Sequence, residues 1–198
     1  MRTIVRWCNW SGEGLDYCSL VEGDKSSVIE GLVIGTPAEN YAAHYTVRTD
    51  RAFRTRGVRV DFVGGPRLHL AADGEGNWRD LIRDEPVPLL TGCLDVDIAI
   101  TPATNTLAIK RLKLKQQESR EIAVAYVPEP AAGTDDFSVQ RMTQRYTCLI
   151  ADHRYRYEGA LQRVTGQGII DHGFTAELQI DEYGLVLDYP EIFRRIQS

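Results

Sequence analysis

Two aspartates, Asp95 and Asp97, stand two residues apart in a segment, Gly92 to Ile100, that alternates like a β-strand. Side chains two apart on a strand share a face, so their Cβ atoms would lie about 6 to 7 Å apart. Carboxyl groups at such a distance can serve as acid and base in glycoside hydrolysis if burial protonates one of them. They can also be structural, bonded to loop amides or paired with cations, and this interpretation is favoured. The basic residues considered for such pairs are Arg54, Arg56, Lys110 and Arg111.

Basic and aromatic side chains offer further binding chemistry. Arg54 and Arg56 share one face of another expected strand, which predicts either an anion clamp or the solvated edge of a curved sheet. The aromatic residues could stack on sugar rings, line an apolar cavity or simply pack in the core. The aromatic candidates are Trp7, Trp10, Trp78, Tyr155 and Tyr157.

No motif indicates a nucleophile, a dinucleotide or a metal ion. The four histidines are isolated, and neither Gly-x-Ser-x-Gly nor Gly-x-Gly-x-x-Gly occurs. The four cysteines are scattered without a Cys-x-x-Cys pair, which predicts reduced thiols in packed positions. We therefore expect no cofactor and no metal, and binding more readily than catalysis.

The elements that must position these residues are mainly strands. Runs with period-two alternation recur between Gly, Asp and Asn clusters, which is typical of an antiparallel sheet linked by hairpins. The runs are 27–33, 43–49, 57–63, 67–71, 122–127, 144–151 and 174–180.

Two helices are expected. The stronger prediction covers Asp188 to Ile196, where a proline follows a capping position and apolar residues recur at helical spacing. The weaker one begins at Thr101-Pro102 and continues through Asn105 to Leu112.

Composition limits the class of protein. With 198 residues, 43% of them apolar, the chain is expected to form one domain, residues 1–198. The net charge of −5 argues against nucleic acid as a partner. No stretch approaches the roughly 18 to 20 apolar residues of a membrane span, and residues 1–10 lack the apolar centre of a signal peptide. We therefore expect a cytoplasmic protein.

Several motifs together resemble those of the glycolipid-binding family, a bacterial group formerly described only as a domain of unknown function. The resemblance covers essentially the whole chain and is most specific in its centre. The matching motifs are Trp7-x-x-Trp10, Gly14-Leu15, Asp50-x-x-Phe53-Arg54-x-Arg56, Gly92-Cys93-Leu94-Asp95-Val96-Asp97-Ile98, Thr101-Pro102-x-Thr104-Asn105-Thr106-Leu107, Arg111-Leu112 and Gly184-Leu185-Val186-x-Asp188-Tyr189-Pro190.

This resemblance implies a spiral β-roll, a long antiparallel sheet wrapped around one helix. It also implies a shape like that of periplasmic lipoprotein carriers and, in many members, a homodimer. Glycolipid binding in the family is itself inferred from the fold.

The first hypothesis is a carrier without catalysis, which encloses the acyl chains of a glycolipid or other amphipathic molecule inside the roll and holds its polar head at the mouth. An architectural or oligomeric interaction protein is the second hypothesis. A sugar-acting hydrolase that uses Asp95 and Asp97 is the third. The candidate ligand-binding residues are Asp95, Asp97, Thr104, Asn105, Arg54, Arg56, Trp78 and Arg111.

Overall fold

The computed structural model describes residues 1–36, 40–129, 138–165 and 168–196, without the side chains of residues 160–172. The N-terminal strands are β1 Arg2–Asn9, β2 Leu15–Glu22, β3 Ser26–Ile34, β4 Ala42–Asp50, β5 Thr55–Phe62, β6 Arg67–Ala72, β7 Trp78–Asp80 and β8 Glu85–Pro86. The central elements are η1 Pro88–Leu90, β9 Asp95–Ile98, η2 Pro102–Thr104 and α1 Asn105–Leu112. The C-terminal strands are β10 Ser119–Val127, β11 Gln140–Ile150, β12 Arg154–Thr165, β13 Gly168–Ile180, β14 Val186–Tyr189 and β15 Phe193–Arg195.

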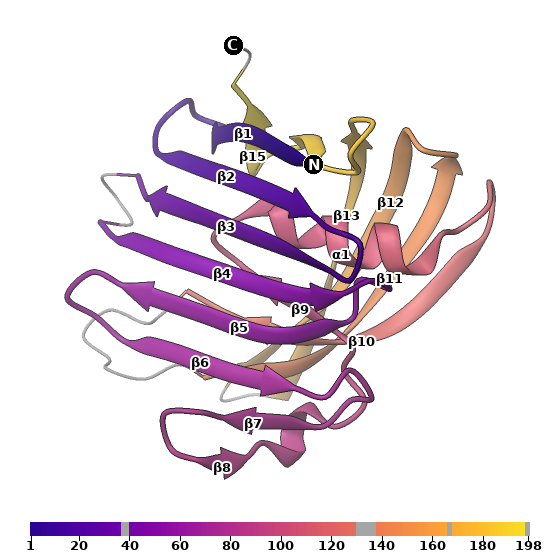
Figure 1. The fold of residues 1–198 in the computed structure, drawn as a ribbon. Helices are drawn as coiled ribbons and strands as arrows, with labels where there is room; N and C mark the ends of the chain where they lie inside the picture. The colour runs from indigo at the N-terminus through magenta and orange to yellow at the C-terminus, as the bar shows by residue number, and fades with distance from the viewer. Residues whose placement is uncertain (37–39, 130–137, 166–167, 197–198) are drawn as a thin grey trace.

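All these strands belong to a single sheet that curls around α1 without closing into a barrel (Figure 1). The sheet runs from β8 back to β1, continues through β15 and β14, and then runs down from β13 to β9. Neighbouring strands in the described residues pair antiparallel, except that β9 pairs parallel with β10. The prediction of a mainly antiparallel sheet rolled around a helix is therefore confirmed.

The expected strands form where apolar side chains alternate. In β4, Ala43, Tyr45 and Val47 are fully buried, while Arg48 is exposed. Gly31 of β3 is the register partner of Tyr45 and lets its ring lie flat across the strand. A Cβ atom at Gly31 would come within 2.4 Å of the Tyr45 ring and hydroxyl, so another residue would force the ring away.

The helix that begins at Thr101-Pro102 is confirmed. The Thr101 hydroxyl accepts a hydrogen bond from the amide of Ala103 at 3.1 Å, and Pro102 opens the 3-10 turn that leads into α1. The helix ends at Lys113, whose φ of 48° is left-handed, and Lys110 and Arg111 in its last turn complement the helix dipole.

The predicted C-terminal helix from Asp188 to Ile196 is wrong. This segment forms β14, a turn and β15, with Glu191 at a φ of 68° in the turn. The two short strands join β13 to β1, because β14 pairs with β13 and β15 pairs with β1. A helix would leave both strands unpaired there, and so long-range pairing overrides the local helical spacing.

The helix lies between two apolar clusters. Leu107 packs with the N-terminal strands and β9, whereas Ala108 and Ile109 pack with β11 to β14. Large side chains such as Trp7 and Leu185 are completely buried and fill the interior. The four cysteines are also buried and unpaired, as predicted.

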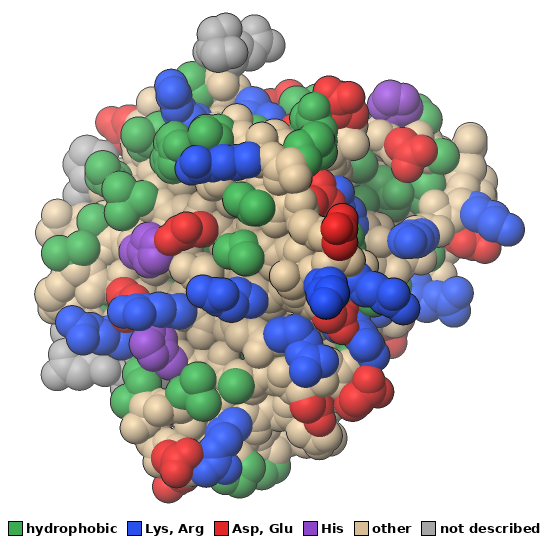
Figure 2. All heavy atoms as spheres, in the orientation of Figure 1, with side chains coloured by type: hydrophobic (Ala, Val, Ile, Leu, Met, Phe, Trp, Pro, Cys, Tyr) green, Lys and Arg blue, Asp and Glu red, His purple; other side chains and the backbone are tan. Residues whose placement is uncertain are grey.

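The outer face of β1 to β6 carries basic side chains among aliphatic ones (Figure 2). Ile4, Leu32 and Ile34 expose 48%, 48% and 50% of their surface there. No helix in the described part of the chain is long and apolar enough to cross a membrane.

Candidate functional site

Asp95 lies at the start of β9 and is neutralised by α1. The Arg111 guanidinium donates three hydrogen bonds to its carboxylate, at 2.9, 3.0 and 2.6 Å. Asp95 exposes 1% of its surface, so the ion pair is largely removed from water. Burial raises the pKa of Asp95, and the hydrogen bonds and charge of Arg111 oppose that rise. The pair fixes the helix to the strand.

Asp97, two residues later, receives hydrogen bonds from neutral groups only. Gln144 of β11 donates to one carboxylate oxygen at 2.6 Å, and the Thr104 hydroxyl donates to the other at 3.1 Å. Asp97 forms no ion pair within the described residues. Burial raises its pKa, with opposition from the Gln144 and Thr104 hydrogen bonds. Asp97 is therefore a part-buried acid without a cation.

A pocket of about 140 Å³ opens beside Asp97, and we call it the tyrosine pocket. Its wall combines the end of β9 and the start of α1 with aromatic rings from the C-terminal strands. The lining residues are Asp97, Ile98, Ala99, Thr101, Asn105, Tyr126, Met142, Tyr157, Gly159, Phe174, Tyr189, Ile192 and Phe193.

The tyrosine hydroxyls of this wall have no hydrogen-bond partner in the described part of the chain. Tyr157 and Tyr189 expose only 7% and 8% of their surface, yet neither hydroxyl makes a hydrogen bond within the described residues. Gly159 leaves room for the Tyr157 hydroxyl, because the Cβ atom of any other residue there would lie 2.7 Å from that oxygen. Both tyrosines line the pocket, so a group bound there could accept hydrogen bonds from their hydroxyls.

The rings of the wall pack against one another, Tyr157 edge to face with Tyr146 and Tyr189 and tilted against Phe174. The Tyr157 centroid lies 5.4 Å from that of Tyr146 and 6.1 Å from those of Phe174 and Tyr189. Burial, followed by the nearby charge of Asp97, raises the pKa of Tyr157 and Tyr189 far above that of a free phenol. The same causes raise the pKa of Tyr126, the register partner of Asp97, to about 12. All three phenols are hydrogen-bond donors at neutral pH.

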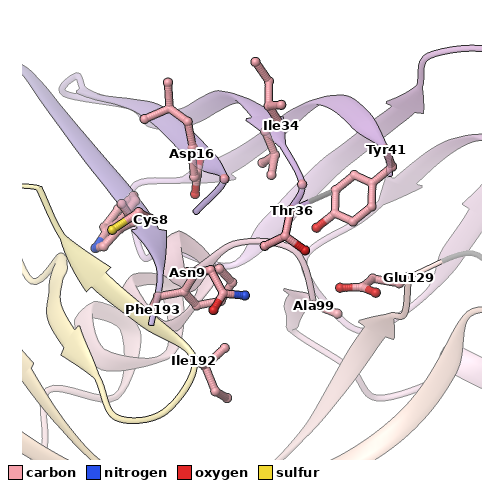
Figure 3. Close-up of a pocket in the computed structure, with 15 residues that line it drawn as sticks. Cys8, Asn9, Asp16, Ile34, Thr36, Tyr41, Ala99, Glu129, Ile192 and Phe193 are labelled. Carbon is pink, nitrogen blue, oxygen red and sulfur yellow. The ribbon is translucent and has the colours of Figure 1, made fainter. Parts of the chain in front are cut away.

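A second, smaller pocket of about 70 Å³ adjoins the first, and the two share Ala99, Ile192 and Phe193 as lining. We call it the acidic pocket, because Asp16 and Glu129 line it. Figure 3 shows the side chains of Tyr41, Thr36 and Glu129 pointing into one space, opposite Asn9. The remaining lining residues are Trp7, Cys8, Gly14, Leu15, Val33, Ile34 and Gly35.

Asp16, at the inner end of the acidic pocket, connects the sheet to the start of α1. The Thr101 hydroxyl donates to its carboxyl group at 2.6 Å, and the Tyr45 hydroxyl does so at 3.2 Å. Burial raises the pKa of Asp16 to about 7, although both hydrogen bonds act to lower it. Asp16 therefore changes its protonation near neutral pH.

The eight predicted ligand-binding residues separate into three groups. Asp97 and Asn105 line the tyrosine pocket, and Thr104 orients Asp97. Asn105 is held by the Tyr146 hydroxyl, which donates to its side-chain oxygen at 2.8 Å. Asp95 and Arg111 are occupied by each other and do not line either pocket.

The other three predicted residues lie elsewhere. Arg54 pairs with Asp50 at 2.8 Å and with Glu75 at 2.7 Å, and so it braces two hairpin turns. Arg56 is exposed and lies close to the Gly74 turn. The buried Trp78 donates its indole hydrogen to the carbonyl of Cys93 at 2.9 Å. Neither pocket includes them.

Most residues of the aromatic wall are not among the candidates that the sequence predicts. Tyr157 is an aromatic candidate from the sequence, whereas Tyr126, Phe174 and Tyr189 come from distant strands and are not among the candidates. Tyr189 does lie in one of the matching motifs, but its apolar spacing there predicts a helix. One local signal existed, the run Tyr157-x-Gly159, in which a glycine two residues after an aromatic leaves room for its ring.

The open interior expected for an acyl chain does not occur among the described residues. The inside of the roll is filled by the two apolar clusters, and the pocket beside Asp97 has a volume of about 140 Å³. A larger groove of about 570 Å³ lies at the C-terminal end of α1, lined by Phe53, Leu114 and Tyr155 among others. It shares no lining residue with the tyrosine pocket.

The arrangement also bears on hydrolysis by two carboxyl groups. Such a mechanism needs both acids to flank one bond of the substrate. Asp97 faces the tyrosine pocket, but both oxygens of Asp95 are bonded to Arg111. Of these two acids, Asp97 reaches the tyrosine pocket and Asp95 does not, so the pair cannot flank a bond of a substrate bound there.

Comparisons with known proteins give consistent results. The profile of a family described as "Putative glycolipid-binding" matches residues 4–195. The chain is similar to a DUF1089 family protein from Pseudomonas aeruginosa of known crystal structure, at 34% sequence identity and a TM-score of 0.69. That similarity covers 91% of this chain and 92% of the other. No curated protein matches the chain.

Proposed function

The chain belongs to the family described as "Putative glycolipid-binding", and from this premise we propose that it binds a glycolipid or a related amphipathic molecule through a polar head held in the tyrosine pocket. The observation that carries the proposal is a ring-sized pocket beside the carboxyl group of Asp97, into which two phenol hydroxyls open without a hydrogen bond from any described residue.

The size of the pocket fits one six-membered ring. Its volume of about 140 Å³ is close to that of an apolar cavity of roughly 150 Å³ that holds benzene. The aromatic side chains offer apolar carbon atoms to the C–H groups of a sugar, while Asp97 and the phenols offer an acceptor and donors to its hydroxyls. The lip of the adjoining acidic pocket includes Leu15 and Ile34, which expose 37% and 50% of their surface and give an apolar path for a tail.

Binding of octyl glucoside below its micelle concentration, followed by calorimetry and by native mass spectrometry, tests this function. We expect Tyr157→Phe to weaken binding about tenfold, because a donor to the head group is lost. Tyr155→Phe is the matched control, since Tyr155 lies on the same strand but lines the separate groove. If no glycoside binds and no lipid co-purifies, the proposed function is wrong.

Two further properties stay predictions. The family resemblance predicts a homodimer, which light scattering during size-exclusion chromatography would detect. The sequence predicts a cytoplasmic location, which fractionation of the source cells would test.

The architectural hypothesis has support at the Asp95 end of β9. The Arg111 ion pair there joins α1 to β9, and the Asp16–Thr101 contact joins the start of the helix to β2. These contacts explain part of the central motif without a ligand. They leave the unpartnered groups of the tyrosine pocket unexplained.

A further inference from the structure

The two adjoining pockets have an uneven distribution of charge. Asp97 lines the tyrosine pocket, and Asp16 and Glu129 line the acidic pocket. Among the described lining residues of either pocket there is no Lys, Arg or His. A group bound beside Asp97 therefore meets a carboxyl group and no basic side chain among the described lining residues.

Asp97 in particular has no counter-charge among the residues that the structure describes. The guanidinium of Arg111 pairs with Asp95, whereas Asp97 accepts hydrogen bonds from the neutral Gln144 and Thr104. A part-buried carboxylate without a cation is costly, because its hydration has been removed without an opposite charge in exchange. A cation on the ligand would supply that charge.

The aromatic wall favours the same kind of ligand. Tyr157, Phe174 and Tyr189 form a triangle with centroid separations of 6.1, 6.1 and 5.9 Å. The faces of aromatic rings attract cations, and the attraction grows when water is excluded. An anionic head, such as a phosphate or carboxylate, would find phenol donors but would also be repelled by Asp97 at short range.

We propose that the head group held in the tyrosine pocket carries a protonated amine, which pairs with Asp97 against the rings of Tyr157 and Tyr189. This inference rests on the proposed function and narrows it to a ligand class. The amine could belong to an amino sugar or to an alkylammonium group, and the experiment separates these sources.

Calorimetry on the full chain with four small probes tests the proposal. The sugar probes are methyl glucoside, methyl glucosaminide and its N-acetyl derivative, which has an amide in place of the amine. Tetramethylammonium is the probe for an alkylammonium source. Below the pKa of the sugar amine, we expect the glucosaminide to bind at least tenfold more tightly than either neutral sugar, or tetramethylammonium to bind where the neutral sugars do not.

Asp97→Asn should remove this preference, so that charged and neutral probes bind alike. Glu30→Gln is the matched control, because it removes the same charge from the outer face of the sheet and should leave the preference unchanged. Circular dichroism of both variants confirms that they are folded before binding is compared.

The outcomes separate this inference from the function on which it rests. Neutral and charged sugars that bind equally to the unaltered protein would overturn the amine and leave the binding function intact. An amine preference that survives Asp97→Asn would overturn the role of Asp97. Failure of every probe and of octyl glucoside to bind would overturn both proposals.

Discussion

Asp95 and Asp97 are two residues apart on β9, but they belong to different kinds of environment. Asp95 is 1% exposed and bound by three hydrogen bonds from one guanidinium, whereas Asp97 is part-buried, has neutral partners and faces a pocket. A carboxyl group with a complete set of partners supports the fold. A carboxyl group that lacks one is available to a ligand, and so the partners rather than the spacing distinguish the two roles.

The largest effect is expected at the Asp95 end. Arg111→Ala leaves a buried carboxylate without its cation, and it should lower the free energy of unfolding by about 3 to 5 kcal/mol. Urea denaturation measures this change. Arg54→Ala is the control, since the Arg54 side chain pairs at the surface in contact with water, and it should lower the free energy of unfolding much less than Arg111→Ala does. If both variants lost the same free energy of unfolding, the Asp95–Arg111 pair would be no more important for the fold than a surface ion pair.

Asp16 allows the comparison to be extended to pH. Its pKa is raised from 3.8 to about 7 in the folded protein, so the folded state binds the proton more tightly than the unfolded state. Stability from this group is present at low pH and is lost as pH rises toward and through 7. Between pH 5 and pH 8 the loss should be about 2 to 3 kcal/mol.

Urea titrations of the unaltered protein and of Asp16→Asn at several pH values measure this loss. The variant should show a flatter dependence over this range, because it has no carboxyl group to ionise. If the two proteins share one pH profile, Asp16 is not the group responsible.

Two tyrosines whose ring centroids lie 5.4 Å apart give a finer comparison. Tyr146→Phe removes a hydroxyl that donates to Asn105, and it should cost about 1 to 2 kcal/mol because the Asn105 oxygen loses its partner. Tyr157→Phe removes a hydroxyl that bonds to none of the described residues, and it should change stability by less than about 0.5 kcal/mol. Thermal unfolding of both variants is the measurement, and a reversed order would contradict the assignment of the Tyr157 hydroxyl to a ligand.

The smallest effect on stability is expected for Asp97→Asn. The amide is close in shape to the carboxyl group, and the change removes a charge that has no cation, so stability should shift by about 0.5 kcal/mol or less. Urea denaturation at neutral pH measures this shift. A loss as large as that of Arg111→Ala would mean that Asp97 is structural as well.

The alternating runs predicted the sheet because they are local signals of one buried face. They predicted β3 to β6 closely, and the Thr101-Pro102 step predicted α1. The apolar spacing at the C-terminus wrongly predicted a helix, because Tyr189, Ile192 and Phe193 lie in the β14–β15 hairpin that links β13 to β1. Helical spacing over nine residues cannot reveal that two distant strands need a partner.

The candidate site was predicted only in part for the same reason. The spacing of Asp95 and Asp97 marked them as neighbours, and Thr104 and Asn105 follow in the same segment. Their different partners come from far along the chain, since Gln144 lies 47 residues beyond Asp97. Local sequence thus located the acids, and only the rolled sheet decides which one meets the aromatic wall.

An open sheet has two free ends, and here both are unsuited to adding another strand. The outermost strand at one end is β8, which is two residues long and ends in Pro86, a residue without an amide hydrogen. At the other end, the Ile98 amide of β9 already donates to Thr104, and the neighbouring Leu94 carbonyl already accepts from Thr55. The protein should therefore resist fibril growth by strand templating, even when concentrated.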